Sequence, residues 1–154
     1  MKKLEFKIDI NANAKKVWDT FLNPETFKEM TSVSHPGSYY KGQWKKDENI
    51  KFLSAREGGT LANVVDLRPF EYILVKHVAV LNADGTEDRN SQQAKGWIGT
   101  TEEYNFIPRD GKTEFKVVVN TTPEWEKMFS DAWPNNLKKI KEICERSKVG
   151  AQSA

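Results

Sequence analysis

A histidine, a carboxylate and a phenol occupy positions where strand geometry could bring their side chains together. His77 follows Ile73 and Val75 on one face of an alternating run, and Glu102 and Tyr104 share one face of a later run. If these runs are antiparallel neighbours with His77 opposite Glu102, all three polar groups point to one apolar surface. Such a pair would transfer protons, orient a ligand, or only satisfy two buried polar groups.

Other kinds of chemistry have less support in the sequence. Covalent catalysis needs a nucleophile beside the histidine, and the chain has no G-x-S-x-G motif. The single cysteine, Cys144, lies on the apolar stripe of the last predicted helix, where a buried hydrophobic role is expected. The two histidines, His35 and His77, form no cluster with zinc-ligand spacing, and no phosphate-binding glycine motif occurs. We therefore expect no metal and no cofactor.

Aromatic residues are numerous, with five tryptophans and eight phenylalanines. A helix held off a curled sheet leaves space that small residues cannot fill, so large side chains are expected to line a ligand-binding cavity. Asn63 is assigned to the same face as Leu61 and Val65 and so to the interior. The residues expected to bind a ligand are His77, Glu102, Tyr104, Trp44, Phe52, Asn63, Trp97, Met128, Phe129 and Trp133.

The elements that would position these residues follow a simple order. An alternating run at 4–10 predicts a strand with one wet face, and Asn13 and Asn23 are expected to cap two short helices. After a polar loop with one short strand, alternating runs separated by turns predict a meander of strands from Asn49 onward. The stretch NADGTEDRNSQQAKG is expected to be a hydrophilic connection. Thr122 and Pro123 are expected to open the last helix.

The last predicted helix contains a proline. Apolar residues recur at helical spacing on both sides of Pro134, in the stretch FSDAWPNNLKKIKEI. A proline inside a helix usually causes a bend, and a bend would let the helix follow a concave sheet. The predicted fold is therefore α+β, with a curved antiparallel sheet wrapped around a long C-terminal helix and two short helices after the first strand.

Size and charge restrict the classes of function. The 154 residues suffice for one domain, expected at 1–147, followed by a flexible tail at 148–154. The net charge is +2 with interleaved signs, which argues against nucleic-acid binding. The N-terminus lacks the apolar region of a signal peptide, and no run of about 18 apolar residues occurs. We expect a cytoplasmic protein without membrane contact.

Four stretches carry a resemblance to a known family: INANAKKVWDTF, PGSYYKGQW, EEYNFIPRDGKTEF and FSDAWPNNLKKIKEI. In their order and spacing they resemble the SRPBCC superfamily, also called START-like or helix-grip, and within it the branch related to the activator of the heat-shock-chaperone ATPase. The chain departs from that branch after Trp44, where Lys45-Lys46-Asp47 replaces a frequent glycine. The resemblance implies a sheet that grips a long helix with an apolar cavity between them.

The function expected from these observations is non-catalytic binding of a small hydrophobic or amphipathic molecule between the sheet and the last helix. One alternative is a protein-interaction module of the chaperone-activator type, in which the outer sheet face or the loop 31–47 meets a protein partner. Another alternative is a cyclase or hydrolase that uses His77 and Glu102. The partners expected are thus a small ligand and, in the alternative, another protein.

Overall fold

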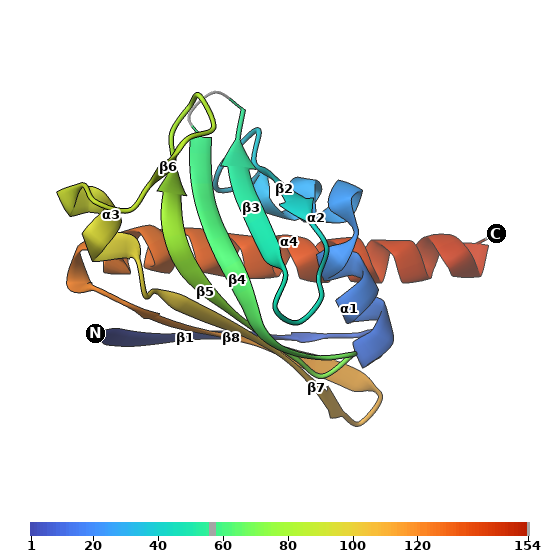
Figure 1. The fold of residues 1–154 in the computed structure, drawn as a ribbon. Coiled ribbons are helices and arrows are strands. Elements are labelled where there is room, and N and C mark those ends of the chain that lie inside the picture. Colours follow the sequence, from blue (N-terminus) through green and yellow to red (C-terminus); the bar gives the residue numbers. More distant parts are fainter. Residues whose placement is uncertain (56–57, 154) are drawn as a thin grey trace.

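The protein consists of one curved antiparallel sheet and a long helix that crosses the concave side of the sheet (Figure 1). The computed structural model describes residues 1–55 and 58–153, with side chains as far as residue 146. The strands are β1 (Lys2–Ile10), β2 (Tyr39–Gly42), β3 (Asn49–Ser54), β4 (Gly58–Arg68), β5 (Tyr72–Leu81), β6 (Glu87–Asp88), β7 (Thr101–Arg109) and β8 (Lys112–Thr121). The helices are α1 (Ala14–Leu22), α2 (Pro24–Thr31), α3 (Gln92–Trp97), the 3₁₀ turn η1 (Pro123–Trp125) and α4 (Glu126–Ser153). This architecture confirms the predicted fold class.

The strand order in the sheet is β1-β8-β7-β5-β4-β3-β2, and the short β6 pairs with β5. The β7–β8 register pairs Phe106 with Phe115 and Tyr104 with Val117, as the sequence predicts. Both predicted helix caps are also confirmed, because the side chain of Asn13 accepts from the Lys16 N–H and that of Asn23 from the Glu25 N–H.

The long helix continues through Pro134, as the apolar spacing predicts. Its inner stripe joins the core formed by α1 and the concave sheet face; Leu137, Ile140 and Ile143 are all buried there. α1 and α2 lie toward one end of the sheet and α3 toward the other, beside the start of α4 (Figure 1). A proline-induced bend in α4 stays a prediction.

The hydrophilic connection after β5 differs from the prediction because it contains the helix α3. Ser91 caps this helix by accepting the Ala94 N–H at 3.0 Å. A Cβ atom at Gly96 would come within 2.1 Å of a carboxylate oxygen of Glu124 in η1, which is the movable end of a flexible side chain. The carbonyl of Gly96 also accepts the Thr122 hydroxyl. A six-residue polar helix has too few apolar positions to show a helical period.

The pairing of β5 with β7 differs from the register predicted from the sequence. The expected pairing of His77 with Glu102 is wrong: Glu102 pairs with Val75, and Tyr104 pairs with Ile73. The His77 N–H instead donates to the carbonyl of Thr100 at 2.8 Å. The displacement is two residues, and side chains alternate between faces with a period of two, so every side chain keeps its predicted face.

The two edge strands of the sheet are β1 and β2. Helix α4 contacts the end of β1, where Lys141 Nζ donates to the Asp9 carbonyl at 3.2 Å and Glu145 accepts the Asn11 N–H at 3.0 Å. The other edge, β2, has only four residues and ends at Gly42, which has a positive φ of 126°.

Two remaining expectations concern the membrane and the C-terminus. Among the described residues, no helix is both long and apolar enough to cross a membrane. The flexible tail expected at 148–154 stays a prediction, because its side chains and all of Ala154 lie outside the described residues.

Candidate functional site

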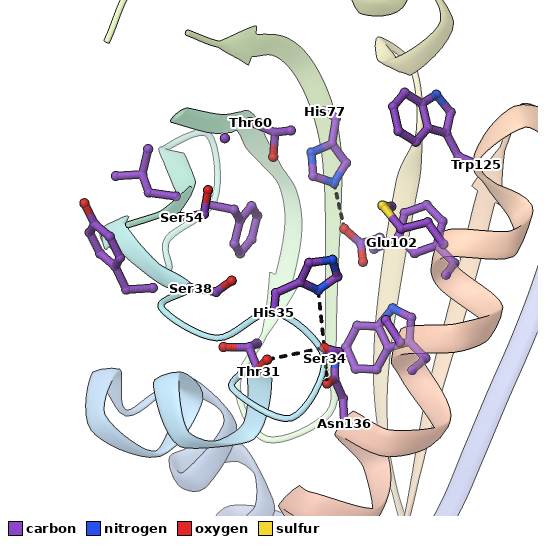
Figure 2. A pocket seen from close by; sticks show the side chains of 18 of the residues that line it. Thr31, Ser34, His35, Ser38, Ser54, Thr60, His77, Glu102, Trp125 and Asn136 are labelled. Atoms are coloured by element: carbon purple, nitrogen blue, oxygen red, sulfur yellow. Dashed lines mark hydrogen bonds and ion pairs between the residues drawn. The ribbon is translucent and has the colours of Figure 1, made fainter. Parts of the chain in front are cut away.

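A pocket of about 450 Å³ lies between the concave sheet face and the first half of α4 (Figure 2). The sheet contributes residues of β2, β3, β4, β5 and β7, one wall comes from α3, η1 and α4, and α2 with the following loop contributes the opposite side. Its aromatic and large apolar lining comprises Phe27, Met30, Tyr39, Phe52, Leu53, Val80, Leu81, Trp97, Tyr104, Trp125, Met128, Phe129 and Trp133. The pocket therefore has the size and lining typical of small-molecule sites.

A buried histidine–carboxylate pair stands in the wall of this pocket. Nε2 of His77 lies 2.6 Å from Oε2 of Glu102, and the two residues are only 2% and 7% exposed. They are diagonal neighbours across β5 and β7, because the register places Glu102 opposite Val75. The register correction thus leaves the predicted meeting of the two side chains intact.

The phenol of Tyr104 completes the predicted polar group. Burial raises its pKa well above the usual value, and the negative charge of Glu102 and a hydrogen bond to that carboxylate add to the rise. The phenol therefore keeps its proton. Glu102 is consequently in contact with a protonated phenol on one side and an imidazole on the other.

Three ring nitrogens around the pocket lack a hydrogen-bond partner among the described residues. They are Nδ1 of His77, Nε1 of Trp97 and Nε1 of Trp125, and all three atoms are buried. The rings lie close together: the His77 and Trp97 centroids are 4.6 Å apart, and those of Trp97 and Trp125 are 5.2 Å apart. Buried polar atoms are normally paired, so these three nitrogens are exceptions to that rule.

Hydroxyl groups line the pocket on the side away from Trp125 (Figure 2). They belong to Thr31, Ser34, Ser38, Ser54 and Thr60. Ser34 donates to Oδ1 of the buried Asn136 at 2.7 Å and so joins the loop after α2 to α4. The pocket thus has an aromatic wall with ring nitrogens and a second wall with hydroxyls.

Eight of the ten predicted site residues line the pocket, namely Phe52, His77, Trp97, Glu102, Tyr104, Met128, Phe129 and Trp133. Trp44 lies behind Phe52, with ring centroids 6.0 Å apart, and is absent from the lining formed by the described residues. Whether any of these residues contacts a ligand stays a prediction.

The expectation that Asn63 points to the interior is wrong. Its amide donates to Asn49 Oδ1 at 3.1 Å and to the Asp47 carbonyl, away from the pocket. A register irregularity between Val64 and Asp66 is the physical reason. Alternation counted back from the inward-facing Leu67 would place Val65 and Asn63 on the inner face. The bulge lies between these positions and Leu67, so Val64 and Ala62 face inward instead.

Several lining residues were missed by the sequence reasoning, and some of them had a signal. Trp125 precedes Met128 and Phe129 by three and four positions, and Asn136 follows Trp133 by three, so helical spacing could have placed both on the pocket side. The hydroxyl residues had no comparable signal. Ser34 and Ser38 belong to an irregular loop whose path no periodicity predicts.

The arrangement can hold a proton and bind a polar group inside an apolar space. The cysteine thiol is not available to it, because Cys144 is fully buried in the core, where desolvation raises its pKa. Within the described part of the chain, no cluster of three or more histidine, cysteine or carboxylate residues could hold a metal ion.

Comparison with known proteins places this geometry in a structural context. No protein-family model and no curated protein matches the sequence. Similar solved structures include MLL2253 from Mesorhizobium loti, with a TM-score of 0.72 and 13% identity over 94% of this chain and 98% of that one. NE0264 from Nitrosomonas europaea has a TM-score of 0.70 and 11% identity over 96% of each chain.

A further similar structure is the Aha1 dimer from Colwellia psychrerythraea, with a TM-score of 0.68 and 15% identity over 94% of this chain and 97% of that one. At such identities the likeness concerns the fold alone. It is consistent with the helix-grip or START-like arrangement that the sequence resembles, while membership of the SRPBCC superfamily stays a prediction. The chain thus has a helix-grip type of fold, with a pocket where the sheet and the helix separate.

Proposed function

We propose that this protein binds a small hydrophobic or amphipathic molecule in the pocket and carries out no reaction on it. The observation that carries the proposal is a pocket of about 450 Å³ whose lining is mainly apolar and rich in aromatic rings, with one buried histidine–carboxylate pair in its wall. Small-molecule sites typically have volumes of about 300–1,000 Å³ and a few placed polar groups in an apolar lining. The pocket fits both criteria.

The distribution of polar groups favours an amphipathic ligand over a pure hydrocarbon. His77 and Glu102 supply a fixed polar point on the sheet side, and the hydroxyls supply a second set across the pocket. A ligand with polar groups at its ends and an apolar middle would satisfy both sets. Its apolar part would lie against Phe129 and Trp133 of α4.

Native mass spectrometry of the protein purified from its own host tests this proposal. We expect a bound small molecule on the wild-type protein and its loss in Ala132→Trp, which puts a large side chain into the pocket from α4. Lys138→Trp is the matched control, because Lys138 lies on the same helix but is exposed. The proposal fails if no small molecule co-purifies and the dye 1-anilinonaphthalene-8-sulfonate also does not bind the wild-type protein.

The two alternatives have weaker support. An interaction module needs a contiguous apolar patch, and the exposed large hydrophobic residues among those described lie on separate elements: Met1, Val33, Val65 and Phe70. A cyclase or hydrolase would use His77 and Glu102, but no described serine or cysteine hydrogen-bonds to that histidine. Both alternatives stay predictions.

A further inference from the structure

Glu102 is the one carboxylate among the described residues that line the pocket. Its Oε2 atom contacts His77, and its other oxygen, Oε1, points into the pocket (Figure 2). The side chain of Glu102 is 9% exposed, and Oε1 is not one of the described polar atoms that lack both a partner and accessible surface. A ligand in the pocket can therefore reach this carboxylate, although it cannot reach the buried ring nitrogens.

The hydrogen bonds of His77 determine the charge of its ring. An imidazolium has two N–H donors, but Nδ1 of His77 is buried and has no partner among the described residues. A charged donor without an acceptor costs more than an unused lone pair on an uncharged ring. His77 is therefore an uncharged imidazole that donates from Nε2 to Glu102.

Glu102 itself is ionised. The phenol of Tyr104 keeps its proton and forms a hydrogen bond with the carboxyl group, and such a bond favours the carboxylate form of the acceptor. The second donor to the carboxylate is Nε2 of His77, at 2.6 Å. The histidine–carboxylate pair thus carries a net negative charge.

This negative charge has no compensating cation among the described residues. The lining contains no lysine or arginine, and His77 is the one described residue within ion-pair distance of Glu102. His35, the other histidine of the lining, is exposed and contacts Ser34. Burial of an uncompensated charge is costly, and a cation bound beside Glu102 would remove that cost.

Aromatic rings surround the polar group and favour the same kind of ligand. The ring centroids of Phe52 and Trp97 lie 5.9 and 4.6 Å from that of His77, and the ring of Trp133 lies 6.0 Å from that of Tyr104. The faces of aromatic rings attract cations, with tryptophan the most effective of them. The rings therefore add to the attraction that the carboxylate exerts on a positive group.

We infer that the ligand is an amphipathic amine, whose ammonium group donates a hydrogen bond to Glu102 and lies against the surrounding aromatic rings. The inference rests on the proposed function and gives the ligand its chemical class. An alcohol could donate to the same oxygen without bringing a charge, and charge-assisted hydrogen bonds are about twice as strong as neutral ones. A carboxylate would be repelled by Glu102.

The apolar part of the ligand has a place next to the carboxylate. The rings of Trp97 and Phe129 are nearly parallel, with an interplanar angle of 11° and centroids 5.7 Å apart. Together they form an apolar surface along the α3 and α4 side of the pocket. An aromatic or aliphatic body attached to the amine would pack against this surface.

Three ligands with the same body and different head groups test the inference: 4-phenylbutylamine, 4-phenyl-1-butanol and 4-phenylbutanoate. At pH 7 the first is a cation, the second is uncharged and the third is an anion. Their affinities are measured by displacement of the uncharged fluorescent dye N-phenyl-1-naphthylamine. We expect the wild-type protein to bind the amine about tenfold more tightly than the alcohol, and the carboxylate about tenfold more weakly than the alcohol.

The variant Glu102→Gln keeps the size of the side chain and removes its charge, so the ratio of amine to alcohol affinity should fall to about one. Glu103→Gln is the matched control. Glu103 is the next residue of β7 and lies on the other face of the sheet, where it accepts from the Tyr72 hydroxyl at 2.8 Å. This control removes the same charge from the protein and should leave the ratio unchanged.

A crystal structure of the wild-type protein with 4-phenylbutylamine is the second test if Glu102→Gln does not fold. The nitrogen of the amine should lie about 3 Å from Oε1 of Glu102. A bound amine with its nitrogen turned away from Glu102 would contradict the inference.

The possible failures have distinct meanings. If the three ligands displace the dye equally well, or if Glu102→Gln folds and keeps the preference for the amine, the inferred amine contact is wrong while the proposed binding function stands. If the folded wild-type protein binds neither the dye nor any of the three ligands, the proposed function itself is contradicted, and this inference with it.

Discussion

The two ends of the interior are built from the same sheet and the same helix, yet one is filled and the other is open. At the filled end, the second half of α4 packs against α1, and Leu137, Ile140 and Cys144 are almost inaccessible. At the open end, the first half of α4 faces the pocket, and Trp125 and Met128 are only half-buried. The two ends differ in which element lies between the sheet and α4.

Helix α1 supplies the filling at the closed end. The ring of Phe21 lies between sheet and helix, with centroids 4.7 Å from Tyr104 and 5.3 Å from Phe115. At the open end, α2 and the following loop border the space without entering it, and about 450 Å³ remains. The comparison indicates that stability is concentrated where α1 packs, whereas the pocket end is available for binding.

The sharpest test of this division removes the filling residue. Phe21→Ala should lower the free energy of unfolding by about 3–5 kcal/mol, because it leaves a cavity in a closed core. Met128→Ala at the open end should cost about 1 kcal/mol or less, since the side chain already borders open space. Urea unfolding followed by circular dichroism measures both. Equal losses would contradict the division of the interior.

A second test enlarges a side chain at each end. Val17→Phe should destabilise the protein by about 1–3 kcal/mol, because the fully buried Val17 on α1 has no free space around it. Ala132→Trp should change the free energy of unfolding by about 0.5 kcal/mol or less, because the pocket can hold the added ring. A larger loss in Ala132→Trp than in Val17→Phe would show that the pocket is not open in solution.

The smallest effect concerns the two contacts that join α2 and its loop to α4. One contact is charged: both oxygens of Glu29 accept from Arg146, at 2.8 and 3.1 Å. The other contact is the uncharged hydrogen bond from Ser34 to Asn136. These contacts should differ in their response to pH.

The hydrogen bond from Arg146 lowers the pKa of Glu29, and the positive charges of Arg146 and Lys139 contribute to the same shift. Since the pKa is lowered in the folded state, the contribution to stability is present above the unfolded value of 4.5 and is lost as the pH falls through the folded value. Glu29→Gln should therefore be less stable than the wild type at pH 7 and equal to it at the acid end. Ser34→Ala, the control, should show the same loss at both pH values. The midpoints of urea unfolding, measured for the wild type and both variants from pH 7 to acid pH, would test these expectations.

The sequence predicted the fold and the central pair for one physical reason. Side chains of a strand alternate with period two, so His77 and Glu102 kept their faces even though the pairing differs by two residues. The insertion of a short helix, α3, could not be predicted from a six-residue polar segment. Asn63 was misplaced because a single bulged residue reverses the alternation, and a bulge has no compositional signal in this strand.

The pocket volume could not be derived from the sequence at all. It depends on how α2 and the following loop are placed relative to α4, and the irregular loop has no periodicity from which that placement could be predicted. The aromatic lining was predictable because helical spacing places Phe129 and Trp133 on one face of α4. Trp44 is as large as the tryptophans that line the pocket, but it packs behind Phe52. Residue type alone therefore could not distinguish a residue that lines the pocket from one that packs behind the lining.

The edges of the sheet have a consequence for how this protein meets copies of itself. An open strand edge is a template on which a foreign chain can continue the hydrogen-bond ladder and begin a fibril. Here Lys141 and Glu145 of α4 hydrogen-bond to the backbone at the end of β1. The other edge strand, β2, has only four residues and ends at Gly42. These features leave less backbone on which a foreign strand could pair, and so they oppose the growth of a shared hydrogen-bond ladder between copies of the protein.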